Sequence, residues 1–189
     1  MRSPRLFRPE DSALLVVDVQ EKLAPLMPAP SQLIDRLALL IDGAKLLEVP
    51  TLVTEQYPAG LGSTVPPLAG RLEDAVEKRQ FSAAVDAILE PLRQSNIRNV
   101  VVCGVETHIC VLQTVYDLLA NGFRVQVTVD AVASRGLLDH QTAMRRFEQA
   151  GATLSTVESI LFEWMQSSEH PQFRAVSRLV KEATPSTNQ

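Results

Sequence analysis

Asp18 is the first residue of the sequence whose type and position suit catalytic chemistry. It directly follows Ala13–Val17, a continuous aliphatic run that is typical of a strand buried on both faces. A carboxylate at the end of such a strand can act as a general base, or as an ion-pair partner on the floor of a cleft. On position alone, an equally good interpretation is a carboxylate that caps the next turn.

Cys110 is the second candidate. It follows the apolar run Asn99–Cys103 and the turn Gly104–His108, and it falls in the first turn of an expected helix. Unpaired backbone N–H groups and the positive end of the helix dipole would favour its thiolate and lower the pKa of the thiol. The same N–H groups suit a developing oxyanion. A buried, inert thiol is weighed equally, because that is the commonest role of a free cysteine.

A cation for the same cleft is available in Lys78. The segment Val76–Phe81 leaves a long loop and precedes an expected helix from Ala83, so Lys78 can point back over the cleft. On spacing alone, a solvated run of charges is the favoured interpretation.

The other cysteine and the histidines give weaker candidates. Cys103 lies inside an apolar strand, where an inert core role is expected. His108 is two residues from Cys110, and helix residues two apart do not face each other, so a Cys–His dyad is disfavoured. His140 and His170 have no proximity to Cys110 in the sequence.

The elements that must position these residues alternate between apolar runs and segments of helical period. Strands are expected at 13–18, 50–54, 99–103, 123–130 and 153–157. Helices are expected at 31–48, with Ser31 as the N-cap, and at 83–94, 107–120, 137–150, 159–165 and 172–182. The segment Glu55–Arg71 holds three Gly and three Pro, which indicates a long and functional loop.

This alternation predicts a three-layer α/β/α fold of Rossmann-like type, with a central, mostly parallel sheet. Ligands in such folds bind beyond the carboxyl ends of the strands, where Asp18 and the segment Gly104–Cys110 are expected. A nucleotide-binding module is disfavoured, because the turn Asp18–Lys22 has no G-x-G-x-x-G pattern.

Composition sets the broad class. The 189 residues are 46% hydrophobic and 21% charged, which predicts one globular domain over 1–189 with its core at about 12–182. A net charge of −4 does not indicate the basic surface that binding to nucleic acid or an anionic membrane would need. Two cysteines make no disulfide scaffold, so a cytoplasmic location is expected. Glu10 and Asp11 follow the early arginines at once, so no targeting leader is expected.

Three blocks carry a resemblance to a known family: Leu14–Gln20, Glu77–Ser82 and Val102–Val111. In this order and spacing the chain resembles the isochorismatase-like cysteine hydrolases, the superfamily of isochorismatase, nicotinamidase and N-carbamoylsarcosine amidase. The match runs from about 12 to 180. The stretches Val53–Pro58 and Asp130–Arg135 are most similar to small isochorismatase-domain proteins of poorly defined substrate.

The resemblance implies a catalytic triad of Asp18, Lys78 and Cys110. It also implies an oxyanion hole formed by the backbone N–H groups of Glu106 and Cys110, and a cis peptide bond between Val105 and Glu106. Family members commonly form homo-oligomers. The apolar segment Ile160–Trp164 would serve either an interface or the core.

The chain departs from the nicotinamidases at their metal site. That family has an Asp-x-His type site in the loop after the second strand, whereas Glu55–Arg71 contains none of the chain's three histidines. No metal and no cofactor are therefore expected.

The implied function is a metal-independent cysteine hydrolase that cleaves a small amide or related C–N substrate through a covalent Cys110 thioester. Isochorismatase-type vinyl-ether hydrolysis is one alternative, and a non-catalytic binding or scaffold protein that retains the fold is another. The expected partner is a small molecule, without nucleic acid or membrane. Candidates for the pocket wall are Gln20, Glu55, Gln56, Tyr57, Phe81 and Thr107.

Glu55 and Glu106 would suit a substrate with an amine or several hydrogen-bond donors, or would bind backbone. The sequence leaves open the substrate and the roles of the His108 and Glu106 side chains.

Overall fold

A computed structural model describes residues 3–183 and shows a six-stranded sheet in the order β3-β2-β1-β4-β5-β6. Every neighbouring pair of strands is parallel. The strands are β1 (Ser12–Val17), β2 (Thr51–Gln56), β3 (Val76–Lys78), β4 (Asn99–Val105), β5 (Arg124–Ala133) and β6 (Thr153–Ser155).

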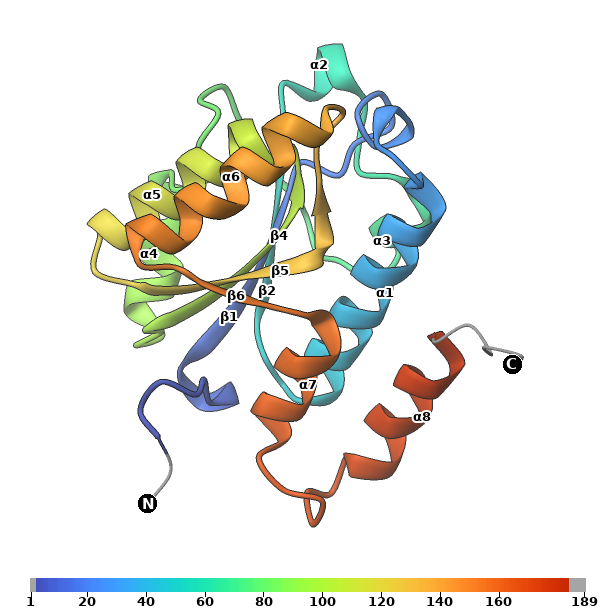
Figure 1. Ribbon diagram of the computed structural model, residues 1–189, viewed down its shortest axis with the longest axis vertical. Coiled ribbons are helices and arrows are strands. Elements are labelled where there is room, and N and C mark those ends of the chain that lie inside the picture. Colours follow the sequence, from blue (N-terminus) through green and yellow to red (C-terminus); the bar gives the residue numbers. More distant parts are fainter. Residues whose placement is uncertain (1–2, 184–189) are drawn as a thin grey trace.

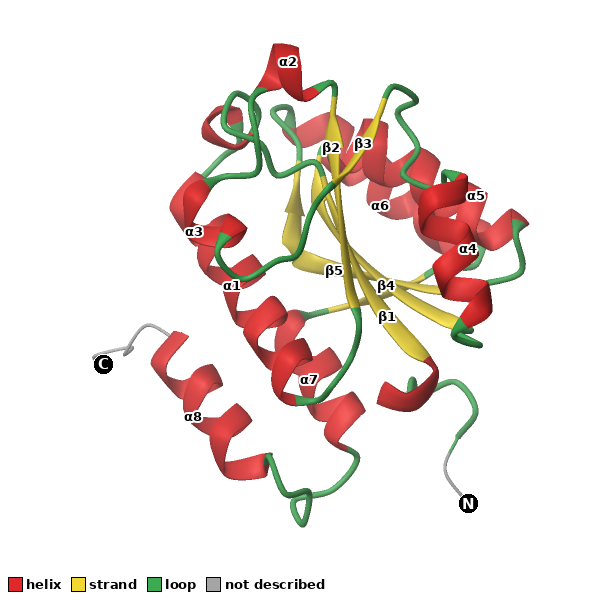
Figure 2. Cartoon of the chain, turned by 180° about the vertical axis from the view of Figure 1, so that it is seen from behind, coloured by secondary structure: helices red, strands yellow, loops and turns green. Residues whose placement is uncertain are grey.

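Helices cover both faces of the sheet. They are α1 (Pro30–Leu46), α2 (Pro58–Leu61), α3 (Pro66–Ala69), α4 (Asp86–Gln94), α5 (Leu112–Ala120), α6 (Leu137–Ala150), α7 (Val157–Met165) and α8 (Phe173–Ala183), with the one-turn elements η1 (Pro9–Asp11), η2 (Ala24–Leu26) and η3 (Thr107–Val111). Figure 1 shows α4, α5 and α6 on one side of the strands and α1 and α7 on the other, with α8 packed outside α1; Figure 2 shows the same layers from behind. The predicted three-layer α/β/α architecture is confirmed.

Two apolar cores hold the layers together, and β1 belongs to both because its side chains alternate. Leu14 and Val16 pack in the core under α1 and α7, which also contains Trp164. Leu15 packs in the core under α4, α5 and α6, which also contains Phe147. All five side chains are fully buried, and each contributes about 1.5–3 kcal/mol relative to exposure. The continuous aliphatic run was therefore a sound predictor of a central strand.

Gly104 allows β1 and β4 to approach closely at the point where the strand order reverses. Its φ is +113°, and an added Cβ would lie 2.1 Å from the carbonyl oxygen of Val17. Only glycine has no atom there and adopts such a φ at little cost. In doubly wound sheets, ligands bind beyond the carboxyl ends of the strands at this reversal point. Asp18 after β1 and Glu106 after β4 lie at that expected ligand site.

Three local predictions differ from the structure. Ser31 is not the N-cap of α1: the helix begins at Pro30 after Ala29, without a side-chain cap bond. Proline fits a first helical position, because its missing N–H would have had no partner there. The strand β3 was missed, because three residues are too short to show a period.

The third difference concerns the expected long loop, Glu55–Arg71. Its first two residues, Glu55 and Gln56, complete β2, and the remainder contains α2 and α3. For the segment Ile160–Trp164, the core interpretation is correct: Ile160, Leu161 and Trp164 are buried.

Candidate active site

The predicted acid and the predicted cation form a buried ion pair. The Nζ atom of Lys78 lies 2.6 Å from Oδ2 of Asp18, and the hydroxyl of Thr54 donates to the other carboxylate oxygen at 2.8 Å. Asp18 has φ 53°, a left-handed conformation that Asp adopts more readily than most residues, and this turns the chain immediately after β1. Both carboxylate oxygens therefore have a fixed partner.

The ammonium group of Lys78 has further acceptors around it. Its Nζ donates to Oε1 of Gln56 at 2.9 Å and to the carbonyl oxygens of Phe81 and Gln80 at 3.0 and 3.3 Å. The parallel register places Lys78 on β3 beside Gln56 on β2. A buried ammonium needs such partners, because an unpaired charge is costly to remove from water. Lys78 is thus built into the site and is not part of a solvated charge run.

Cys110 lies in η3, one turn beyond β4, close enough to Asp18 for the carboxylate to raise the pKa of its thiol. Its side chain keeps 6% of its surface exposed, whereas Cys103 in the middle of β4 keeps none. The hydroxyl of Thr114 donates to the Cys110 carbonyl at 2.6 Å and accepts from the Ala83 N–H at 2.8 Å, which anchors this turn. Lys78, Asp18 and Cys110 therefore form one contiguous row across the carboxyl ends of the strands.

The predicted lowering of the Cys110 pKa is wrong for this state of the protein. Burial first, and then the negative charge of Asp18 and hydrogen bonding to it, together raise the pKa of the thiol to about 12, although Lys78 and the Glu106 backbone N–H lower it. Desolvation disfavours the charged form of a thiol, and here it outweighs the cation. The raised pKa therefore favours the protonated thiol at neutral pH.

Glu106 begins the turn that carries Cys110, and its peptide bond with Val105 is cis. Its backbone N–H is close enough to Cys110 to lower the pKa of the thiol. Its carboxylate accepts from both the backbone N–H and the Nε–H of Arg135, at 3.0 Å each. The carboxylate is therefore occupied by the end of β5, so the part of the prediction that gave it to a substrate amine has no support in this geometry.

Two of the predicted pocket residues, Gln20 and Glu55, are engaged with backbone groups. The side chain of Gln20 donates to the carbonyls of Gln56 and Gly62 at 3.1 and 2.6 Å and accepts from the Gln56 N–H at 2.8 Å. The carboxylate of Glu55 accepts from the backbone and hydroxyl of Thr64 at 2.6 and 2.7 Å. Both side chains brace the segment after β2, and their contact with a substrate stays a prediction.

The remaining pocket candidates differ in their exposure and in their contacts with the three residues. Tyr57 and Phe81 are exposed by 42% and 53%, and the Arg79 guanidinium lies 4.1 Å from the centre of the Tyr57 ring. Gln56 directly contacts Lys78. Thr107 is buried, and its hydroxyl pairs with Nδ1 of His140 at 3.1 Å.

Sequence reasoning missed several residues that hold the site. Thr54, at the end of β2, had no distinguishing signal except its place near a strand end. His108 pairs through Nδ1 with the buried Ser134 hydroxyl at 2.9 Å, and His140 has its pKa lowered by burial. Both histidines fasten the Cys110 turn to β5 and α6 and do not contact the sulfur in any described interaction.

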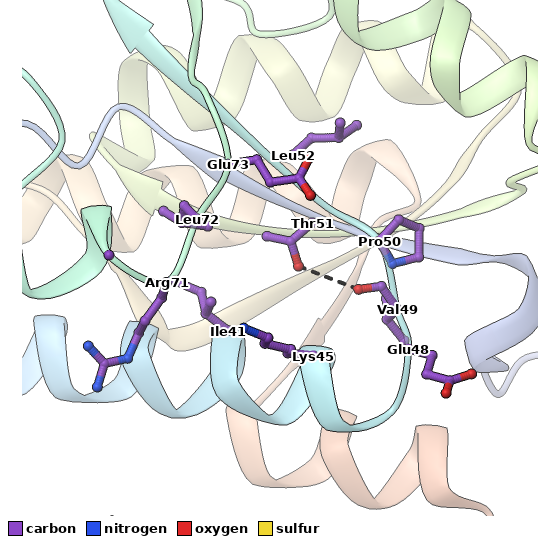
Figure 3. A pocket seen from close by; sticks show the side chains of 11 residues that line it. Ile41, Lys45, Glu48, Val49, Pro50, Thr51, Leu52, Arg71, Leu72 and Glu73 are labelled. Atoms are coloured by element: carbon purple, nitrogen blue, oxygen red, sulfur yellow. Dashed lines mark hydrogen bonds between the residues drawn. The ribbon is translucent and has the colours of Figure 1, made fainter.

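The hollow drawn in Figure 3 lies at the opposite, amino end of β2, against α1 and the segment 70–73. Its volume is about 520 Å³, and Lys45, Glu48, Arg71 and Glu73 give it charges of both signs. It contains none of the residues predicted for the site, so we assign the chemistry to the Asp18–Cys110 end. Within residues 3–183, no cluster of His, Cys, Asp or Glu is arranged to hold a metal ion, and no helix is long and apolar enough to cross a membrane.

Comparisons with known proteins identify the family and the fold. The family model for the isochorismatase domain matches residues 12–159. The isochorismatase domain-containing protein 2 of Bos taurus is 42% identical over 178 residues, which cover 94% of this chain and 86% of that protein. A solved structure described as MAR1 ribonuclease from Caenorhabditis elegans is 41% identical with a TM-score of 0.90, covering 97% of this chain and 96% of that one.

A more distant neighbour supports the fold alone. The YcaC gene product of Escherichia coli, described as an octameric hydrolase of unknown specificity, has a TM-score of 0.82 at 24% identity and covers 97% of this chain and all of its own (100%). The matched family model spans β1 to the start of α7 and therefore includes Asp18, Lys78 and Cys110. The chain belongs to the isochorismatase-like hydrolase family.

Proposed function

We propose that this protein is a cysteine hydrolase that cleaves a small amide or related C–N substrate, with Cys110 as the nucleophile and no metal in the mechanism. The observation that carries the proposal is the buried pair of Lys78 and Asp18, 2.6 Å apart, beside the Cys110 thiol, whose pKa Asp18 raises and Lys78 lowers. A nucleophile, its base and a charge that orients the base are the parts that covalent catalysis requires.

In the first half-reaction, the thiol proton moves to Asp18 as the sulfur bonds to the substrate carbonyl carbon. This coupling is needed because a thiol whose pKa is raised to about 12 is almost wholly protonated at neutral pH. The carbonyl oxygen takes the negative charge, and the backbone N–H groups of Glu106 and Cys110 receive it. The C–N bond then breaks, and the leaving amine takes the proton from Asp18.

In the second half-reaction, water adds to the thioester and gives a proton to Asp18. The C–S bond breaks, the acid product leaves, and the sulfur regains its proton from Asp18. Lys78 stays charged throughout and stabilises the carboxylate whenever it is ionised. No step requires an oxidant, a reductant or a second substrate beyond water.

The test compares wild type with Cys110→Ala on a panel of small amides, N-carbamoyl compounds, a vinyl ether and an RNA oligonucleotide. The RNA arm is included because the C. elegans neighbour is described as a ribonuclease, although a net charge of −4 does not favour a polyanion. Cys103→Ala is the matched control, because Cys103 is fully buried in the core under α1 and α7, whereas Cys110 belongs to the core on the other face of the sheet. Retention of amide hydrolysis by Cys110→Ala would overturn the proposal.

The same panel separates the alternatives. Turnover of the vinyl ether alone would indicate isochorismatase-type chemistry. Absence of turnover, together with failure of iodoacetamide to label Cys110 in preference to Cys103, would indicate a binding or scaffold protein. Homo-oligomer formation is part of the proposal and is measured by light scattering of the full chain.

A further inference from the structure

The carboxylate of Glu106 is almost fully buried, yet it makes its bonds to the most exposed arginine of the described ion pairs. The Glu106 side chain keeps 5% of its surface exposed, and the Arg135 side chain keeps 58%. Oε2 of Glu106 accepts from the backbone N–H of Arg135 and from its Nε–H, each at 3.0 Å. A charge-assisted pair of bonds to one oxygen fixes the direction of the carboxylate more tightly than a single contact would.

The backbone of Glu106 is held from its other side. Its carbonyl oxygen accepts from the N–H groups of Ile109 and Val111, at 3.0 and 3.2 Å, within the turn that contains Cys110. The preceding residue, Val105, pairs in register with Ala133 at the end of β5. The Glu106 peptide is therefore held between β5 and η3, and its N–H is close enough to Cys110 to lower the pKa of the thiol.

A purely structural role for this carboxylate would be an expensive solution. An ionised carboxylate is costly to take out of water, and its partner Arg135 stays 58% exposed, so the pair gains little from a buried charge contact. The turn is already anchored by Thr114 on Cys110 and by His140 on Thr107. The charged pair at Glu106 adds directional control over one peptide, and that peptide is the proposed oxyanion donor.

We infer that the Glu106 carboxylate and the Arg135 guanidinium form a positioning pair that aims the Glu106 backbone N–H at the substrate oxyanion. The inference rests on the proposed function and extends it to two side chains. Neither side chain is a catalytic residue, because each acts through the Glu106 peptide. The exposed guanidinium also makes the pair accessible to a small replacement from solvent.

The test uses the full chain and 4-nitrophenyl acetate, an activated acyl donor whose carbonyl oxygen passes through the same oxyanion when a thiol is acylated. The background rate of Cys110→Ala is subtracted. Removing one oxyanion donor outright costs about 10²–10³ in kcat, so a misaimed donor in Glu106→Gln or Arg135→Ala should cost about 10–100-fold. KM should stay close to wild type, because the interaction forms only in the transition state.

Chemical rescue separates positioning from folding. Millimolar methylguanidinium should restore part of the kcat of Arg135→Ala by occupying the vacated place on the Glu106 carboxylate, and it should not restore Glu106→Gln. The double variant should be no slower than the slower single variant, because the two side chains act as a unit. The matched control is Asp42→Asn, which breaks an exposed pair with Arg71 at 3.1 Å and should keep wild-type kcat.

The supporting result is reduced kcat at constant KM, rescue of Arg135→Ala by methylguanidinium, and non-additivity in the double variant. Any other combination overturns the inference, including a loss of kcat that follows a fall in melting temperature and is not rescued. If Cys110→Ala itself keeps full activity, the proposed function fails. If Cys110→Ala is inactive while Glu106→Gln and Arg135→Ala match wild type, only the inference fails.

Discussion

Lys78 and Asp18 are 60 residues apart in the sequence, yet the Nζ atom of Lys78 lies 2.6 Å from Oδ2 of Asp18 with both side chains shielded from solvent. The pair joins β3 to the end of β1 across the intervening strand β2, whose Thr54 and Gln56 complete the bonds of both partners. A buried ion pair of this kind adds little net stability over an apolar pair of the same shape. Its place at the carboxyl ends of the strands supports the proposed role of Asp18 as the base.

The ion pair should show strong coupling in unfolding experiments. Lys78→Met leaves the Asp18 carboxylate buried without its cation, and we expect a loss of about 3–5 kcal/mol. Adding Asp18→Asn to Lys78→Met should recover most of that loss, because no charge then remains buried. Urea unfolding of the single and double variants measures both effects.

Arg71→Met is the comparison for this experiment, because Arg71 and Asp42 form an exposed pair whose loss should cost no more than about 1 kcal/mol. Additive costs for Asp18→Asn and Lys78→Met would contradict the coupling.

Asp18→Asn should make the Cys110 thiol more reactive, although it removes the proposed base. The Asp18 charge and the hydrogen bond to it raise the pKa of the thiol, while Lys78 lowers it. Without the carboxylate, the pKa falls and the thiolate fraction at pH 8 rises about tenfold for each unit. Iodoacetamide labelling followed by mass spectrometry measures the rate at each cysteine.

Thr54→Val provides the matched control for the labelling, because it removes a hydrogen bond to Asp18 and keeps the charge. Its labelling rate should stay close to wild type. Cys103 reports unfolding in every sample, since it is fully buried in the folded protein. Slower labelling of Cys110 in Asp18→Asn, with Cys103 protected, would disprove this electrostatic account.

Gly104→Ala should destabilise the protein more than the same substitution at a glycine whose added Cβ would have free space. The added Cβ would meet the Val17 carbonyl at 2.1 Å, and φ +113° is strained for alanine. We expect a loss of at least about 2 kcal/mol, from overpacking and backbone strain together. Gly70→Ala is the control, because nothing lies within 4 Å of its added Cβ. Equal unfolding midpoints for the two variants would refute the close-approach argument.

His140 should make the protein sensitive to mild acid. Burial lowers its pKa from the ordinary value of 6.5, so in the pH range just below 6.5 the unfolded chain binds more protons at this residue than the folded protein does. Stability from this group is present above pH 6.5 and falls as the pH falls. His140→Gln should lose less unfolding free energy than wild type between pH 7 and pH 5. A parallel loss in both proteins would show that His140 is not responsible.

The positions of Asp18 and Cys110 could be predicted from the sequence, because parallel strands bring their carboxyl ends to one edge of the sheet. The place of Lys78 could not be predicted from the pattern alone. It depends on a three-residue strand and on its register with Gln56, and neither leaves a periodic signal. The resemblance to a family supplied this third residue.

The direction of the pKa shift of Cys110 could not be predicted from the sequence either. A helix start suggested a lowered pKa, but the balance depends on how far the thiol is buried and on its bond to Asp18. Likewise, Gln20 and Glu55 are polar residues at a strand end, and no sequence pattern reveals that backbone groups at Gln56, Gly62 and Thr64 occupy them. The sequence therefore predicted which end of the sheet these side chains lie at, but only the tertiary structure shows which groups they bind.

The all-parallel pairing of the sheet also bears on how the protein folds. Parallel neighbours cannot be joined by hairpins, so each pairing waits for a crossover helix to dock, and contacts between distant segments form slowly. Asp18, Lys78 and Cys110 meet only after β1 to β4 have assembled. Any fragment that carries all three residues must therefore span β1 to η3, and recovery of thiol chemistry during refolding should report the assembly of these four strands.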